Sequence, residues 1–119
     1  MSGTVFIVED DVDTREMLEH FLETEGYAVE TAANGRIALE RLAGGVRPAV
    51  ILIDLMMPVM DGWQFRRAQV RDSRLARIPV IVVSAAGRER VTQIDADDYL
   101  SKPVNLDELL ARVTHYCGT

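Results

Sequence analysis

Side chains that can do chemistry stand at the ends of four short apolar runs in this sequence. Three consecutive acids follow the first of these runs, a single acid follows the second, a serine follows the third and a lysine follows the fourth. These residues are Glu9, Asp10, Asp11, Asp54, Ser84 and Lys102. Two carboxylates about 4 Å apart repel by roughly 4 kcal/mol at an effective dielectric constant of about 20. A fold that gathers these acids must therefore raise a carboxyl pKa or bind a cation.

The ligand atoms on offer indicate which cation would fit. Carboxylate oxygens with room for water suit Mg²⁺ or Mn²⁺, whereas zinc favours sulfur or imidazole, which these segments lack. The alternative is that an acid after a strand only caps the next helix, as we expect of Asp13, with Glu16 at the capping-box spacing. Acids after two neighbouring strands favour the cation site, as does Lys102, the one lysine among thirteen basic residues.

Short runs rich in β-branched residues alternate with helical patterns along the chain. The runs are Thr4–Val8, Ala28–Thr31, Ala49–Ile53, Ile78–Val83 and Asp98–Leu100. The third and fourth are apolar throughout, which is typical of strands covered on both faces of a parallel sheet. Strands that alternate with helices over short connections predict an α/β fold. We expect a doubly wound, five-stranded parallel sheet with helices on both faces.

Polar residues mark where the helices should begin. Asn34 and Asn105 are expected caps, Asp61 and Gln64 have the spacing of a capping box, and Gly62 is expected to permit a tight turn at a helix start. In an open α/β sheet, ligands bind at the carboxyl ends of the strands. The acids, the serine and the lysine should therefore lie together at one edge of the sheet.

Size and charge exclude several classes of protein. The chain has 119 residues and a net charge of −6, without a linker or repeat, so we expect one domain over residues 1–119. The negative charge argues against direct binding of nucleic acid or of an anionic membrane surface. A single cysteine, no secretory signal and no long apolar run predict a cytoplasmic protein.

Four motifs, in order and close to the usual spacing, carry a specific resemblance. They are VFIVEDD at 5–11, ILIDLMMPVMDG at 51–62, VIVVSA at 80–85 and ADDYLSKP at 96–103. Together they closely resemble the receiver domain of bacterial two-component response regulators, over essentially the whole chain. The resemblance implies a flavodoxin-like fold with strand order 2-1-3-4-5.

The resemblance also implies a reaction and its residues. A phosphoryl group would pass from a phosphohistidine of a sensor histidine kinase, or of a histidine phosphotransfer protein, onto Asp54. Glu9 and Asp10 would hold Mg²⁺, with Mn²⁺ as a possible substitute. Asp54 would be both ligand and phosphoacceptor, and the backbone carbonyl of Met56 would be a further ligand.

Three later residues complete the implied site. Ser84 would hydrogen-bond a phosphoryl oxygen, Lys102 would pair with the phosphoryl group, and Tyr99 would change rotamer on activation, although it could also be plain core packing. A hydroxyl and an ammonium suit phosphoryl transfer because its transition state needs positioning and charge neutralisation. Lys102-Pro103 is also expected to be a cis peptide, which X-Pro bonds adopt at low cost.

The leading interpretation is a signalling switch with Mg²⁺-dependent self-phosphorylation and slow self-dephosphorylation, rather than an enzyme with a diffusible substrate. Its output would pass to a downstream protein or to a fused output domain. One alternative is a pseudo-receiver that only binds partners and never takes phosphate. Another is a Mg²⁺-dependent aspartyl phosphatase, which would want a second aspartate where Met56 stands.

Two features do not follow from this interpretation. Ser84 and Lys102 are 18 positions apart, shorter than in common receivers by about one helical turn. A fourth helix near residues 88–94 should therefore be short or irregular, and the output surface should differ from the common type. A basic stretch, Arg66, Arg67, Arg71, Arg74 and Arg77, could be a solvated helix face or a docking patch for an acidic partner.

Overall fold

The computed structural model describes residues 3–85 and 95–118. The strands are β1 (Thr4–Val8), β2 (Ala28–Ala32), β3 (Val50–Ile53), β4 (Val80–Ser84) and β5 (Asp98–Ser101). The helices are α1 (Val12–Thr24), α2 (Gly35–Ala43), α3 (Gly62–Arg71) and α5 (Leu106–Cys117). The expected short helix near residues 88–94 lies outside the described residues.

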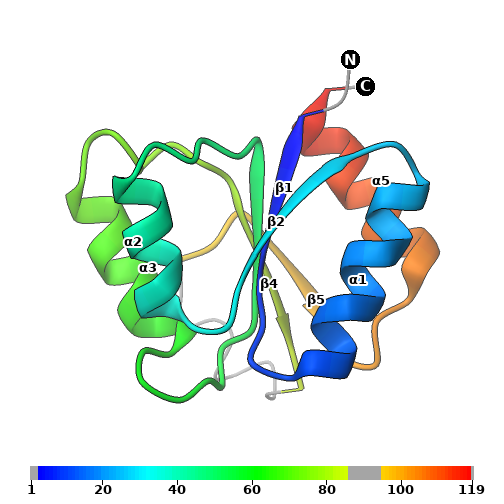
Figure 1. Ribbon diagram of the computed structural model, residues 1–119, viewed down its shortest axis with the longest axis horizontal. Helices are drawn as coiled ribbons and strands as arrows, with labels where there is room; N and C mark the ends of the chain where they lie inside the picture. The colour runs from blue at the N-terminus through cyan, green and yellow to red at the C-terminus, as the bar shows by residue number, and fades with distance from the viewer. Residues whose placement is uncertain (1–2, 86–94, 119) are drawn as a thin grey trace.

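The five strands form one parallel sheet in the order β2-β1-β3-β4-β5, which confirms the prediction of a doubly wound, flavodoxin-like fold. Helices α1 and α5 cover one face of the sheet, while α2 and α3 cover the other (Figure 1). None of the helices in the described ranges is long and apolar enough to cross a membrane.

Alternate residues of the central strands belong to two separate hydrophobic cores. In β1, Phe6 and Val8 pack in the core under α2 and α3, whereas Val5 and Ile7 pack in the core under α1 and α5. β3 and β4 divide their residues in the same way, and both strands are buried along their whole length. The continuous apolar runs of the sequence therefore have the expected cause, which is burial on both faces.

The helix starts follow the expected chemistry, with one correction. Asn34 and Asn105 accept backbone N–H groups at the starts of α2 and α5, and Asp61 and Gln64 form the capping box of α3. The expectation that Asp13 caps α1 is wrong. Asp11 is the cap, because its carboxylate accepts both the backbone N–H and the hydroxyl of Thr14, at 2.9 and 2.6 Å.

Gly62 sets how closely α3 approaches the end of β3. A Cβ at this position would lie 2.9 Å from the Leu55 Cα and 3.0 Å from the Asp54 carbonyl oxygen. The Gly62 N–H also donates to the Leu55 carbonyl at 3.0 Å. The glycine is thus required by close approach of the two segments, rather than by the tight turn expected from the sequence, and it fixes the segment that carries Asp54.

Candidate functional site

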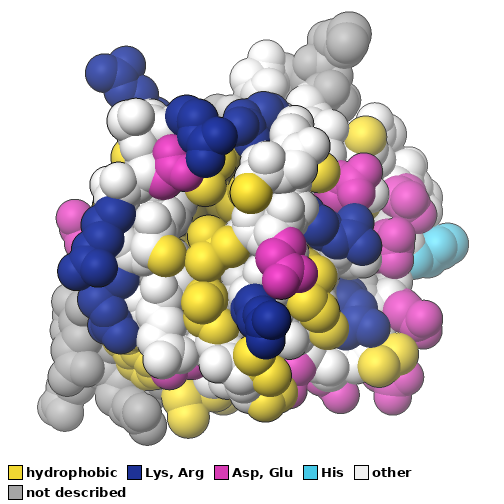
Figure 2. Space-filling view, turned by 60° about the vertical axis from the view of Figure 1, so that its left-hand side comes forward, with side chains coloured by type: hydrophobic (Ala, Val, Ile, Leu, Met, Phe, Trp, Pro, Cys, Tyr) yellow, Lys and Arg dark blue, Asp and Glu magenta, His cyan; other side chains and the backbone are white. Residues whose placement is uncertain are grey.

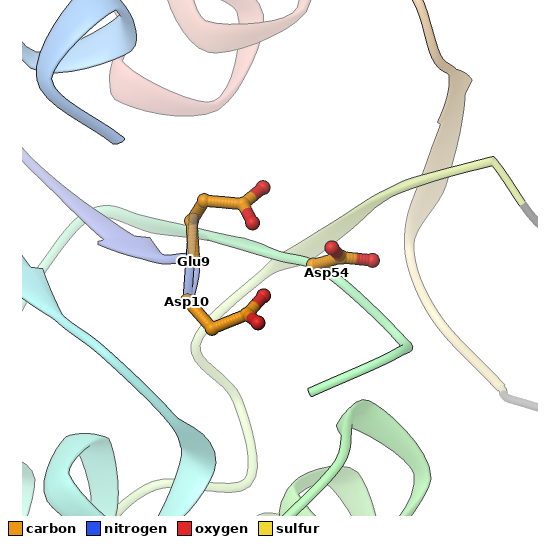
Figure 3. A group of neighbouring side chains, drawn as sticks. All are labelled: Glu9, Asp10 and Asp54. Carbon is orange, nitrogen blue, oxygen red and sulfur yellow. The ribbon is translucent and has the colours of Figure 1, made fainter. Parts of the chain in front are cut away.

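Three carboxylates converge at the carboxyl edge of the sheet. Glu9 and Asp10 follow β1, Asp54 follows the neighbouring strand β3, and one oxygen from each lies within 4.8 Å of the others. Figure 3 shows the Glu9 and Asp10 side chains turned to the side on which Asp54 lies. Glu9 and Asp54 are buried and Asp10 is exposed, so the cluster is open to solvent through Asp10.

The backbone N–H, the backbone carbonyl and the side chain of Glu9 all form hydrogen bonds. Its backbone N–H donates to the Ala32 carbonyl at 3.0 Å, and its side chain accepts the Asp11 N–H at 3.1 Å. Arg15 of α1 donates to the Glu9 carbonyl at 2.8 Å. Burial raises the pKa of the Glu9 carboxyl, and the nearby Asp54 charge adds to this effect, while hydrogen bonds from Lys102 and Asp11 oppose it. The carboxylate is therefore placed where a positive charge would stabilise it.

Lys102 supplies one such charge. Its Nζ lies 2.8 Å from Glu9 Oε1 and 3.0 Å from Asp54 Oδ2, so a single ammonium bridges two carboxylates from different strands. Burial opposes the charge of Lys102, but the hydrogen bonds to Glu9 and Asp54 outweigh it, and the pKa of the ammonium is raised. The Lys102-Pro103 peptide is cis, as expected.

Hydrogen bonds fix both the backbone and the side chain of Asp54. Its backbone N–H donates to the Val8 carbonyl at 3.1 Å, which ties the end of β3 to the end of β1. Its Oδ1 accepts the Met56 N–H at 3.2 Å, and its Oδ2 accepts the Lys102 ammonium. The Met56 side chain points into solvent with 51% of its surface exposed, so this residue approaches the site through its backbone.

Ser84 and Tyr99 lie on the two strands beyond β3. Ser84 is the last residue of β4 and is buried, and its carbonyl accepts the Lys102 N–H at 3.1 Å. Tyr99 pairs with Val82 in the middle of the β4–β5 ladder. Its side chain is 39% exposed, which does not fit plain core packing, the alternative left open by the sequence.

The donor set fits a hard divalent cation. Three carboxylates face one ammonium, so the cluster retains an excess of negative charge in a partly desolvated place. All candidate side-chain ligands are carboxylate oxygens, and the exposed Asp10 leaves access for water, which Mg²⁺ keeps in its coordination shell. The residues present are therefore suitable for Mg²⁺ at Glu9, Asp10 and Asp54.

The sequence did not reveal the roles of two residues at this edge. Asp11 stands beside the other acids but is used to cap α1, and its hydrogen bonds with Thr14 lower the pKa of its carboxyl. The signal was available, because Thr14 is three residues further along. Arg15 holds the loop through the Glu9 carbonyl, and nothing in its spacing indicates that contact.

The sequence is similar to those of known response regulators. The family model of the response regulator receiver domain matches residues 5–114. The response regulator MprA of Mycobacterium ulcerans (strain Agy99) is 43% identical over 117 residues, which are 95% of this chain and 49% of that protein. This chain spans about half the length of the curated relatives it matches.

Solved structures of similar shape support the same grouping. The signal receiver domain of a signal transduction histidine kinase from Syntrophus aciditrophicus has a TM-score of 0.90 and 34% identity, covering 98% of this chain and 91% of that one. The receiver domain of sensor histidine kinase PA1611 from Pseudomonas aeruginosa PAO1 has a TM-score of 0.87 and 29% identity, with full coverage of both chains. Its structure is described as having a magnesium ion coordinated in the active site cleft.

Proposed function

Because the chain belongs to the response regulator receiver domain family, we propose that it is a phosphoacceptor switch of two-component signalling, with Asp54 as the acceptor. An Oδ atom of Asp54 attacks the phosphorus of a phosphohistidine on a histidine kinase or a phosphotransfer protein. The O–P bond forms as the P–N bond breaks, and the imidazole leaves with the electron pair of that bond. The product is an acyl phosphate on Asp54.

The protein's own residues hold the acceptor and receive the charge. The N–H of Met56 and the ammonium of Lys102 orient the two Asp54 oxygens, so one of them has a fixed direction for in-line attack. Lys102 then moves from the carboxylate to the arriving phosphoryl oxygens, since its point charge sits on a flexible stem. Ser84 donates its hydroxyl to a phosphoryl oxygen from the end of β4.

The proposal includes Mg²⁺ held by Glu9, Asp10, Asp54 and the backbone carbonyl of Met56. When bound, the ion would supply positive charge that neutralises the oxygens of the transferring group. The clustered carboxylates support this assignment, as does the magnesium ion named for the similar PA1611 receiver domain. Phosphorylation would be read out through Ser84 and Tyr99 on β4 and β5.

One observation carries the proposal above all others. A buried acid, Asp54, is hydrogen-bonded through Oδ2 to the only lysine of the sequence, which also holds Glu9. An aspartate used only to stabilise the fold would not need two further carboxylates within 4.8 Å. The carboxylates of Glu9 and Asp10 place negative charge around Asp54, which must approach a phosphoryl group. The Lys102 ammonium, on its flexible side chain, can then move to that group.

The direct test is incubation with acetyl phosphate and Mg²⁺, followed by intact-mass measurement. We expect a phosphoryl adduct in the wild-type chain and none in Asp54→Asn, while Asp107→Asn, a matched change of an exposed acid in the first turn of α5, keeps the adduct. An adduct that persists in Asp54→Asn would assign the acceptor elsewhere. No adduct in a chain that binds Mg²⁺ would favour the pseudo-receiver.

A second test addresses Lys102. Lys102→Ala should retain Mg²⁺ binding and still form the adduct slowly, but phosphorylation should no longer change hydrogen exchange at the amides of β5. If exchange at β5 changes as in the wild type, the proposed role of Lys102 is wrong.

A further inference from the structure

The basic stretch in and after α3 takes no part in the site at the carboxyl edge. Residues 62–79 contain five arginines and one aspartate, a net charge of +4 in a chain whose total is −6, so the rest of the chain carries −10. α3 starts beside the end of β3 and runs back to the start of β4, so its last turn lies at the opposite edge of the sheet from Asp54. Figure 2 shows several Lys and Arg side chains along the left margin of this view and others spread over the top, centre and right of the same face.

The five arginines divide into two groups by their partners. Arg66 is largely buried and donates to the Asp95 carbonyl at 2.7 Å and to Gln69 at 2.9 Å. Arg74 is paired with Asp72, whose pKa falls to about 2 through hydrogen bonds from Arg74. Arg67, Arg71 and Arg77 are exposed and form no ion pair with any residue that the structure describes.

An exposed apolar side chain accompanies the unpaired arginines. Val70 is 49% exposed, and the helical spacing places it on the same face of α3 as Arg67 and Arg71. Arginine is common in protein interfaces because its planar guanidinium pairs with carboxylates in a bidentate geometry. An apolar side chain beside two guanidinium groups adds apolar area that a partner can bury, in addition to the charge that attracts it. We call Arg67, Val70 and Arg71 the arginine edge.

We propose that the arginine edge docks an acidic segment of a partner protein, one that carries glutamates or aspartates around an apolar side chain. The −10 charge on the rest of the chain explains why the partner is not nucleic acid. A polyanionic backbone would extend past Arg67 and Arg71 and be repelled by the negative charge of the rest of the chain. Specific phosphate binding also rests on more contacts than two arginines provide. A short acidic segment of protein is attracted locally without that penalty.

A second copy of the chain is a less suitable occupant. Its acids lie on other surfaces, such as the α1 face with Asp13 and Glu16, so the contact would join two different surfaces. A head-to-tail contact of this kind does not close on itself unless the rotation happens to form a ring, and it otherwise propagates into open chains. The inference goes beyond the proposed function, because it concerns an edge that does not touch the phosphoacceptor.

The experiment uses the unphosphorylated chain and two fluorescent probes at low salt, read by anisotropy. One is a glutamate-rich peptide with leucine at every fourth position, and the other has the same glutamates with serine in place of leucine. We expect Arg67→Gln/Arg71→Gln to weaken binding of the leucine peptide about tenfold, since two exposed charge pairs contribute at this level. Val70→Ser should weaken the leucine peptide only.

The matched control removes two arginines from the neighbouring helix. Arg36 and Arg41 of α2 are already paired with Glu40 and Glu30, so Arg36→Gln/Arg41→Gln should leave peptide binding within about twofold of the wild type. Equal weakening by both double variants, or no binding by the wild type, would overturn the proposal. The same measurement on Asp54→Asn should give the wild-type result, which keeps this test separate from that of the phosphoacceptor.

Two further outcomes would replace the acidic segment with another occupant. Duplex DNA that binds more tightly than the leucine peptide, and loses binding in Arg67→Gln/Arg71→Gln, would assign the edge to nucleic acid. Sedimentation of the wild type that shows concentration-dependent association, absent from that variant, would assign it to a second copy.

Discussion

The cluster of Glu9, Asp10, Asp54 and Lys102 and the cluster of Arg66, Gln69 and Asp97 both join distant parts of the chain through polar side chains. In the first, Lys102 is 93 positions from Glu9 and 48 from Asp54. In the second, Arg66 of α3 contacts Asp95 and Asp97, just before β5. The first is an excess of like charge with one counter-charge, whereas the second is balanced.

In the balanced cluster, hydrogen bonds satisfy the buried side-chain amide of Gln69. Gln69 is fully buried, and its amide N–H groups donate to the Leu75 and Ile78 carbonyls at 2.9 and 3.0 Å while its oxygen accepts from Arg66. Asp97 accepts the Val80 N–H at 2.8 Å. Among the described residues, the Gln69 amide therefore has a partner for its oxygen and for its N–H groups. Buried polar groups with matched partners thus stabilise the fold, whereas a cluster with unbalanced charge is suited to binding a cation.

The largest expected effect breaks the balanced cluster. Gln69→Leu should lower the free energy of unfolding by about 2–4 kcal/mol, because two carbonyls and the Arg66 guanidinium lose a buried partner. Adduct formation per folded molecule should not change. The measurement is urea unfolding, with Gln64→Leu as the control in the same helix, where only the exposed hydrogen bond from the Asp61 N–H to the Gln64 side chain is lost. Equal costs for the two variants would remove the distinction between the clusters.

The next effect breaks the unbalanced cluster. Lys102→Met should destabilise the chain by about 1–3 kcal/mol in EDTA, because it leaves the buried Glu9 and Asp54 carboxylates without a counter-charge. Mg²⁺ should then raise the melting temperature of the variant by more than it raises that of the wild type, since the ion replaces the missing positive charge. If Mg²⁺ raises both by the same amount, the lysine and the cation do not share the cluster.

A third effect sharpens the distinction within the acidic cluster. Asp10→Asn should leave stability in EDTA nearly unchanged, since Asp10 is exposed and the described hydrogen bonds of the cluster do not include it. It should reduce the stabilisation by Mg²⁺, which is about 2.7 kcal/mol at a hundredfold excess over the dissociation constant. Thermal unfolding over a Mg²⁺ titration measures this. Asp13→Asn, an exposed acid of the first turn of α1, should respond as the wild type does.

The smallest effect concerns backbone strain beside the site. Val59 lies in the loop after Asp54 with φ 69° and a side chain that is 69% exposed, so a β-branched residue occupies the left-handed region with little burial in return. Val59→Asn should raise the free energy of unfolding by about 0.5–1 kcal/mol, because asparagine tolerates this region. Val59→Ala should gain less. No gain from asparagine would show that the loop relaxes around valine without cost.

Much of the fold was predictable because its causes are local in the sequence. The continuous apolar runs of β3 and β4 identify strands buried on both faces, and caps such as Asn34 and Asn105 identify helix starts. The boundary of β4 was less predictable. The strand begins at Val80 rather than Ile78, since the Ile78 carbonyl is taken by Gln69 of α3.

Residue types at the ends of the strands can be identified from the sequence, so the sequence predicts that carboxylates and one lysine share an edge of a parallel sheet. The sequence could not predict which role each of several neighbouring acids has. Glu9, Asp10 and Asp11 are consecutive, yet one bridges to Lys102, one faces solvent and one caps α1.

Those roles depend on how the elements pack, as does the difference between Arg66, which is hydrogen-bonded within the fold, and the exposed Arg67 and Arg71. Hydrogen bonding and burial depend on partners that lie far away in the sequence. Residue type and spacing set what a side chain can do, and packing of the elements sets which partner it meets.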